Sequence, residues 1–263
     1  MIFHSLCALF YLSKKYSFKM RLLLISNSTM PGGEYLRYPM PEIGQFIGNK
    51  PLNVLFIPYA AVTFSFDEYE ARVKERFAEL NHSVKSIHHS TDHAKAVKEA
   101  DVLVVGGGNT WQLVRMMNDN GLFPLIRDRI LAGIPYIGWS AGSNVACPTL
   151  RTTNDMPIID PKGFDCLNVI PFQINPHYLD KNPEGHGGET REQRIEEFLE
   201  INPNIFVVGL REGTMLLREG NNLSLIGKRT ARIFKKGEVP VELNEKDDMS
   251  FLINNDKPRL SQK

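Results

Sequence analysis

The sequence predicts an α/β fold, in which a doubly wound, mostly parallel β-sheet is followed by antiparallel hairpins near the C-terminus. Short apolar runs alternate with stretches of helical periodicity along most of the chain, as in parallel sheets covered by helices. Several runs are apolar at consecutive positions, which is typical of strands buried on both faces. Residues 213–236 instead form short apolar pieces separated by turn residues, which indicates hairpins.

The individual elements follow from these patterns. Strands are predicted at residues 22–26, 54–58, 84–87, 102–105, 135–139 and 206–210. Helices are predicted at residues 66–80, 110–117 and 122–132, where apolar side chains recur at spacings of three and four. A further helix begins at Arg191, because Thr190 and Gln193 form the capping box of a helix N-terminus.

The chain has 263 residues, which allows one large domain or two small ones. We expect a single α/β domain at residues 20–245 and a loose polar tail at residues 246–263. Residues 1–19 are expected to be a leader or start-site extension outside the fold, because Met20 stands directly before the first strand. An amphipathic helix packed on the domain is the alternative for this segment.

Composition excludes several classes of protein. The net charge of +1, from 31 Lys+Arg and 30 Asp+Glu, provides no positive field that would attract nucleic acid. The apolar run at residues 2–12 is shorter than the roughly 20 residues that span a bilayer, and its lysines follow it, unlike those of a secretory signal. Three cysteines without metal-type spacing point to a reducing compartment. We therefore expect a cytoplasmic protein without cofactor, metal, nucleic-acid partner or membrane partner.

The most informative segment is Gly138-x-Ser140-x-Gly142, which follows a predicted strand and precedes a helix. This is the arrangement of a nucleophile elbow, a turn so tight that only small residues fit two positions either side of the serine. Ser140 is therefore the candidate nucleophile, and the backbone N–H of Ala141 is a candidate oxyanion donor. The alternative is a tight packing turn without catalytic function.

A second glycine run, Gly-Gly-Gly-Asn-Thr at residues 106–110, follows the preceding strand. It lacks G-x-G-x-x-G and a following Lys-Ser/Thr pair, so a phosphate-binding turn is the weaker interpretation. An adjacent glycine loop can instead supply the second oxyanion N–H, for which Gly108 is the candidate. Asn109, in the same loop, is a candidate substrate contact.

A serine nucleophile needs a general base, which is usually histidine. His177 follows an apolar run and a proline, so its backbone is well positioned, whereas His186 lies among glycines in a lid-like loop. We favour His177. The remaining histidines lie in the leader or around an early strand, where they are expected at the surface or edge: His4, His82, His88, His89 and His93.

The base in turn needs a carboxylate that fixes its tautomer. Glu212 follows the strand predicted at residues 206–210, and strand ends are where sites gather in open α/β sheets. Asp155 lies in a polar segment beyond the elbow helix. Glu212 is the favoured orienter, with Asp155 shaping the pocket, although a capping or solvated carboxylate is possible for either.

Arg191 falls in the first turn of its predicted helix, where a cation opposes the helix dipole. Such a charge near a proposed site indicates an anionic ligand, since arginine pairs with carboxylates in bidentate fashion. A surface arginine bonded to Glu192 or Glu196 is the alternative.

These segments together resemble the peptidase E family of α-aspartyl dipeptidases, the serine peptidases of family S51. The resemblance covers residues 20 to about 240 and rests on residues 26–29, 106–110, 138–142, 151–157, 175–177 and 184–195. It implies a flavodoxin-like fold related to class I glutamine amidotransferases. Two features depart from the family pattern: the extra leader, and Ser143 in place of the more usual alanine.

The resemblance also implies roles and a substrate. Ser140 is then the nucleophile, His177 the base and Glu212 the third member, while Asp155 matches an aspartate also assigned to the charge relay in this family. The family cleaves dipeptides with an N-terminal aspartate, whose side-chain carboxylate Arg191 would fit. We expect a small peptide substrate and a monomer or homodimer.

Three other functions compete with this expectation. The first is cyanophycinase-like hydrolysis of an aspartate-containing polymer, for which the loops look short. The second is an α/β-hydrolase esterase, in which the acid precedes the histidine, unlike the order Ser140, His177, Glu212. The third is a non-catalytic, amidotransferase-like binding module, which an intact serine, histidine and glutamate set disfavours.

Overall fold

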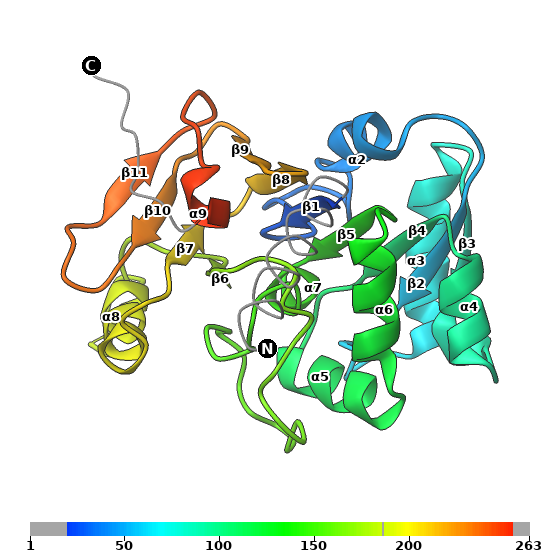
Figure 1. Ribbon diagram of the computed structural model, residues 1–263, viewed down its shortest axis with the longest axis horizontal. Coiled ribbons are helices and arrows are strands. Elements are labelled where there is room, and N and C mark those ends of the chain that lie inside the picture. Colours follow the sequence, from blue (N-terminus) through cyan, green and yellow to red (C-terminus); the bar gives the residue numbers. More distant parts are fainter. Residues whose placement is uncertain (1–19, 186, 255–263) are drawn as a thin grey trace, which may run out of the picture.

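The computed structural model describes residues 20–185 and 187–254 and contains two β-sheets flanked by helices (Figure 1). The core of the larger sheet is parallel and consists of β1 (Arg21–Ile25), β2 (Asn53–Ile57), β3 (Ser83–Ser86), β4 (Val102–Val105) and β5 (Tyr136–Trp139). The antiparallel strands β8 (Met215–Glu219) and β9 (Asn222–Ile226) extend it, giving the order β3-β2-β4-β5-β1-β8-β9.

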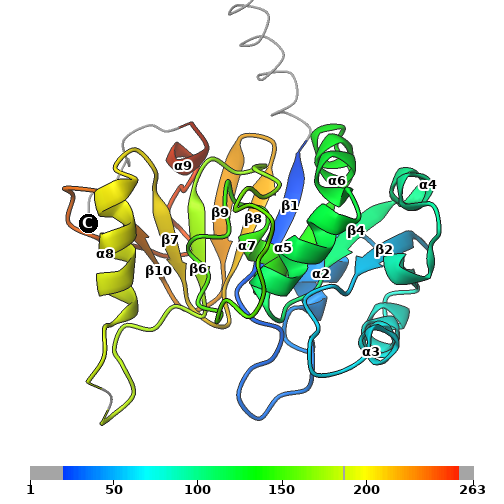
Figure 2. The ribbon, with the colours of Figure 1, turned by 90° about the horizontal axis from the view of Figure 1, so that it is seen from below.

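Helices cover both faces of this sheet. Side chains of β1 alternate between two hydrophobic clusters: Leu22 and Leu24 point to one face, and Leu23 and Ile25 to the other. Helices α4 (His93–Glu99), α5 (Thr110–Asp119) and α6 (Leu122–Leu131) pack in the first cluster. Helices α2 (Met40–Ile47) and α3 (Phe66–Ala78) pack in the second (Figure 2). All four residues of β4 and β5 are buried, as the apolar runs predict.

A second sheet lies beside the first, at the left of Figure 1. It consists of β6 (Gln173–Pro176), β7 (Val207–Leu210), β10 (Ala231–Phe234) and β11 (Val241–Leu243), in the order β11-β10-β7-β6. Strands β6 and β7 are parallel, and the other neighbours are antiparallel. Helix α8 (Arg191–Ile201) packs on this sheet through Ile195 and Leu199.

The α/β class, the mostly parallel sheet and the C-terminal antiparallel strands are confirmed. The division into two sheets was not predicted: the strand at residues 206–210 belongs to the second sheet and pairs with β6. Strand β6 escaped prediction because its four residues, Gln-Ile-Asn-Pro, carry neither an apolar run nor an alternating pattern, although all four are buried. His82, expected at the surface or edge, is buried and directly precedes the edge strand β3.

The prediction of a loose tail from residue 246 is wrong for its first part. Met249, Phe251 and Leu252 are buried, and the short helix α9 (Phe251–Asn254) places the ring of Phe251 against that of Phe206. The proposed leader, residues 1–19, lies outside the described residues, as do residues 255–263. Within the described part of the chain, every helix is too short or too polar to cross a membrane.

Candidate active site

Ser140 occupies a strained turn between β5 and α7 (Ala141–Asn144). Its φ of 53° and ψ of −112° are unusual for a residue with a side chain. A Cβ on Gly138 would lie 2.4 Å from the carbonyl oxygen of Gly142, and a Cβ on Gly142 would lie 2.1 Å from that of Val105. Both glycines are therefore required, as the elbow motif predicts.

The hydroxyl of Ser140 contacts His177, which in turn contacts Glu212. Ser140 Oγ lies 2.8 Å from His177 Nε2, and His177 Nδ1 lies 2.7 Å from Glu212 Oε1. Both distances are those of hydrogen bonds. The side chains of His177 and Glu212 are 38% and 34% exposed, so the hydrogen-bonded chain is reached from solvent.

The three residues come from two sheets. Ser140 follows β5 of the larger sheet, whereas His177 follows β6 and Glu212 follows β7 of the smaller one. Since β6 and β7 are parallel, their carboxyl ends lie at one edge, which brings the histidine and the glutamate together. The candidate site is therefore built at the junction of the two sheets.

Residues after β1 fix this junction. Ser26 is buried, and its hydroxyl donates to the carbonyl of Leu210 at 2.8 Å and accepts from the backbone N–H of His177 at 3.0 Å. Asn27 Oδ1 accepts from the N–H of Gly213 and from the hydroxyl of Tyr38. These contacts hold the residues on either side of Glu212.

Ser26 and Asn27 were missed as positioning residues. They stood in the segment at residues 26–29 that carried the family resemblance, but nothing in the sequence indicated a partner. Their partners in the smaller sheet and after it, His177, Leu210 and Gly213, lie about 150 to 185 positions further along the chain, and only the fold brings them near.

Asp155 is placed differently from Glu212. Its Oδ2 accepts from the backbone N–H of Thr110 at 2.7 Å, from the hydroxyl of Thr110 at 2.6 Å and from Thr153 at 3.0 Å. Asp155 thus lies at the N-terminus of α5, where a carboxylate is favourable for the helix dipole. The contact to His177 is made by Glu212, the favoured orienter.

The segment around Asp155 connects two parts of the site. Asn154 donates through Nδ2 to the carbonyl of Pro176, the residue before His177, at 2.6 Å. Asn154 also accepts from Asn175 Nδ2 at 2.8 Å. The segment at residues 154–155 therefore holds the end of β6 and, through Thr110, the glycine loop that precedes α5.

That glycine loop lies against the elbow. A Cβ on Gly107 would be 3.0 Å from the Cβ of Ser140, and a Cβ on Gly108 would be 2.2 Å from the carbonyl oxygen of Ala60. The N–H groups of Gly108 and Ala141 have no hydrogen-bond partner among residues 20–185 and 187–254. Both donors are thus free to bind a ligand.

Asn109 is occupied by internal contacts. Its Oδ1 caps α5 by accepting from the N–H of Gln112 at 3.0 Å, and its Nδ2 donates to the carbonyl of Met156 at 2.9 Å. Both polar atoms of the side chain thus have internal partners, and the substrate contact of Asn109 stays a prediction. Asn109 fixes the end of the glycine loop.

Arg191 is half-buried in the first turn of α8, behind a complete capping box. Burial lowers its pKa, as does the charge of Arg194, while the charge of Asp155 opposes them. Glu192, the predicted surface partner, bonds to Arg232 instead, and the described residues give the guanidinium of Arg191 no hydrogen bond or ion pair. A cation in this setting favours an anionic ligand.

Ser143, the departure from the family pattern, fits the elbow without disturbing it. Its buried hydroxyl lies 2.8 Å from the carbonyl oxygens of both Ile25 and Gly138. The polar group therefore has a partner in the core.

Two curated proteins are similar to this chain over most of its length. The chain is 48% identical over 233 residues to peptidase E of Nostoc sp., with 89% of this chain and 96% of that protein covered. It is 47% identical over 224 residues to peptidase E of Escherichia coli, with 85% and 97% covered.

Solved structures show the same fold. A peptidase from an acI-B1 Actinobacterium matches with a TM-score of 0.65 at 18% identity, covering 89% of this chain and 98% of that one. A protein described as a putative peptidase E from Listeria monocytogenes matches with a TM-score of 0.54 at 22% identity, covering 86% and 99%. Residues 22–226 match the sequence model of Peptidase family S51. With that match over most of its length and relatives at nearly half identity, the chain belongs to peptidase family S51 and is a serine peptidase.

Proposed function

We propose that the protein hydrolyses dipeptides with an N-terminal aspartate, using Ser140 as the nucleophile. The observation that carries this proposal is the chain of contacts from Ser140 Oγ to His177 Nε2 and from His177 Nδ1 to Glu212 Oε1, at 2.8 and 2.7 Å. A hydroxyl, a base and an orienting carboxylate in this order form the constellation of serine hydrolases.

In the proposed reaction, His177 takes the proton of Ser140 as the oxygen attacks the carbonyl carbon of the Asp-Xaa bond. The negative charge that develops on the carbonyl oxygen is bound by the free N–H groups of Gly108 and Ala141. His177 then passes its proton to the leaving amine, which breaks the peptide bond and releases the second amino acid. Glu212 holds the imidazole in the required tautomer and stabilises its protonated form.

The remaining aspartyl ester on Ser140 is hydrolysed by water. His177 takes a proton from the water, whose oxygen attacks the ester carbonyl, and returns that proton to Ser140 Oγ. The products are free aspartate and the regenerated hydroxyl.

Arg191 is the proposed partner of the substrate's side-chain carboxylate. Its half-buried guanidinium lies near the charge of Asp155, whose segment holds both the end of β6 and the glycine loop. An aspartyl carboxylate would supply the ion pair that the described residues do not form with Arg191. Asp155 is proposed to act by position, since its carboxylate binds Thr110 and Thr153.

We also propose that the protein works in the reducing cytoplasm. Cys147 and Cys166 are both free and buried, and burial raises the pKa of the Cys147 thiol to about 12. Buried, protonated thiols that form no disulfide are typical of proteins in a reducing compartment.

The proposal is tested by hydrolysis of Asp-Leu beside Leu-Leu, Glu-Leu and N-acetyl-Asp-Leu. Cleavage of Asp-Leu alone is expected, because the site would need both the aspartyl carboxylate and the free amine. Ser140→Ala should fold normally and lose at least about 10³-fold in kcat. Equal cleavage of Leu-Leu would contradict the assigned specificity, and cleavage of an aspartate-containing polymer but no dipeptide would favour the polymer hydrolase.

A further inference from the structure

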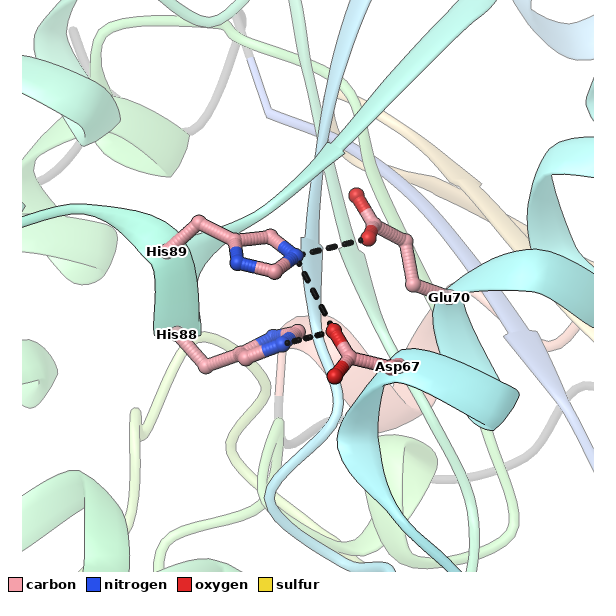
Figure 3. A group of neighbouring side chains, drawn as sticks. All are labelled: Asp67, Glu70, His88 and His89. Carbon is pink, nitrogen blue, oxygen red and sulfur yellow. Dashed lines mark hydrogen bonds and ion pairs between the residues drawn. The ribbon is translucent and has the colours of Figure 1, made fainter.

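Four side chains outside the candidate active site converge between α3 and the short 3₁₀ turn η1 (Ile87–His89) (Figure 3). Asp67 and Glu70 lie three positions apart near the N-terminus of α3, so they face the same side of the helix. His88 and His89 follow β3, and their rings point toward the two carboxylates. His88 and His89 were expected at the surface or edge, without a function.

The distances match those of a ligand set. Asp67 Oδ1 lies 3.0 Å from His88 Nε2 and 3.3 Å from His89 Nε2, and Glu70 Oε2 lies 3.0 Å from His89 Nε2. All the candidate ligand atoms lie within 4.8 Å of one another. In a tetrahedral zinc site, bonds of 2.0–2.2 Å place neighbouring ligand atoms about 3.4 Å apart.

We propose that Asp67, Glu70, His88 and His89 form a zinc-binding site. Two imidazoles and two carboxylates are ligands that zinc accepts, and the two carboxylate charges balance the charge of the ion. The side chains of Asp67 and His89 are 74% and 56% exposed, so an ion can reach the site from solvent. Rotation of these two side chains can also shorten the ligand-to-ligand distances that exceed about 3.4 Å. Glu70 and His88, with side chains only 6% and 15% exposed, form the fixed half of the site.

Ser86 orients this fixed half. Its Oγ lies 2.5 Å from His88 Nδ1, which leaves Nε2 directed at Asp67. Its backbone N–H donates to Glu70 Oε1 at 2.8 Å, and Lys74 Nζ lies 3.0 Å from the same oxygen, which leaves Oε2 for the ion. Outer contacts of this kind orient metal ligands in known sites.

The ion would lie outside the catalytic centre, but two of its ligands belong to α3, the helix that also contacts the glycine loop. The cluster follows β3, and β2 and β4 separate β3 from β5, so the two strands lie three strand spacings, about 14 Å, apart. Tyr69, between the two carboxylates on α3, donates from its hydroxyl to the carbonyl of Gly107 at 2.8 Å and accepts from Trp139 Nε1 at 3.1 Å. Zinc would thus pin the helix turn that supports the glycine loop.

The test measures zinc binding to the full chain by calorimetry at neutral pH. Co²⁺ serves as a spectroscopic probe of the same site. One zinc ion per chain should bind at this site, and Co²⁺ should give the intense visible absorption of a tetrahedral complex. His89→Ala and Asp67→Asn, which change exposed side chains, should abolish both signals. Ser86→Ala should weaken zinc binding by about 10- to 100-fold.

His93→Ala is the matched control, because His93 begins α4 and lies outside the cluster. It should bind zinc like the unmodified chain. Absence of zinc binding, or binding unchanged in His89→Ala and Asp67→Asn, would overturn the proposal and leave the four residues as a network of ion pairs. Thermal unfolding of each variant separates lost binding from lost folding.

Discussion

The hydroxyl of Ser26 accepts a hydrogen bond of 3.0 Å from the backbone N–H of His177, across the junction between the two sheets. Ser26 directly follows the first strand of the larger sheet, and the same hydroxyl donates to the carbonyl of Leu210 at the end of β7. His177 has a φ of 53°, a left-handed conformation that the hydrogen bond helps to hold. One buried hydroxyl therefore sets how the half of the site carrying the base meets the rest of the molecule.

Ser26→Ala should lower kcat by about 10- to 100-fold, because small displacements of a base are costly. It should also lower the free energy of unfolding by about 1–3 kcal/mol, since the part-buried N–H of His177 loses its partner and the carbonyl of Leu210 keeps only its bond from the N–H of Tyr178. Steady-state kinetics and denaturant titration measure the two effects. Ser83→Ala, at an exposed position, is the control and should change neither. A variant as active as the unmodified enzyme would show that Ser26 does not position His177.

Replacement of Glu212 by Gln should separate the two carboxylates that the sequence left in competition. Glu212 lies 2.7 Å from His177 Nδ1, so Glu212→Gln should lower kcat by about 10²- to 10⁴-fold with little change in KM. Asp155→Asn should have the smaller effect on kcat, because Asp155 binds Thr110 and Thr153. The reverse ranking in kinetics on Asp-Leu would assign the relay to Asp155.

Local patterns were enough to predict the elements around Ser140. The glycines at 138 and 142 are fixed by contacts with neighbouring backbone, and such steric needs are visible as a motif. The runs at residues 102–105 and 136–139 are buried on both faces and were readable for that reason. His177 could also be chosen as the base, because it follows an apolar run and a proline. Glu212 could be chosen as its orienter, because it follows the strand predicted at residues 206–210.

The junction of the two sheets could not be predicted. It depends on pairing between β6 and β7, which are about 30 residues apart, and β6 has no apolar pattern of its own. Asn109 shows the same limit at the level of one side chain. Its position in the glycine loop was predicted, but its two internal hydrogen bonds depend on Gln112 and on Met156 from a distant loop.

Gly142→Ala should abolish folding or activity. The added methyl carbon would lie 2.1 Å from the carbonyl oxygen of Val105, a backbone atom that cannot move without displacing β4. Gly187→Ala is the control, since nothing lies within 4 Å of a Cβ built there. Soluble expression and circular dichroism measure the outcome, and a folded, fully active Gly142→Ala enzyme would show that the elbow tolerates a wider turn.

Arg191→Met should lower kcat/KM for Asp-Leu by about 10- to 150-fold. This range corresponds to the 1.5–3 kcal/mol of a hydrogen bond to a charged group. Arg194→Met, on the same helix, removes an exposed arginine that pairs with Glu189 and should have little effect. Equal losses in the two variants would mean that Arg191 acts only through the general field of the helix, and no loss would remove it from the substrate site.

Acid should weaken the second sheet through Glu242. Burial alone would raise the pKa of this carboxyl, but hydrogen bonds from Arg211, Thr230 and Arg232 outweigh it and lower the pKa from 4.5 to about 2. A lowered pKa in the folded state means that the contribution to stability is present above 4.5 and is lost as the pH falls toward 2. Glu242→Gln should therefore be less stable than the unmodified protein at neutral pH, and the difference should shrink across this interval.

The measurement is the free energy of unfolding from denaturant titrations at several pH values. Glu238→Gln, at an exposed position, is the control and should keep the full pH dependence. Arg211 precedes Glu212 and bonds to both Asp180 and Glu242, so the same acid interval should disturb the orienting carboxylate before the whole chain unfolds. A constant difference between Glu242→Gln and the unmodified protein from neutral pH to about 2 would contradict the assigned role of this ion-pair network.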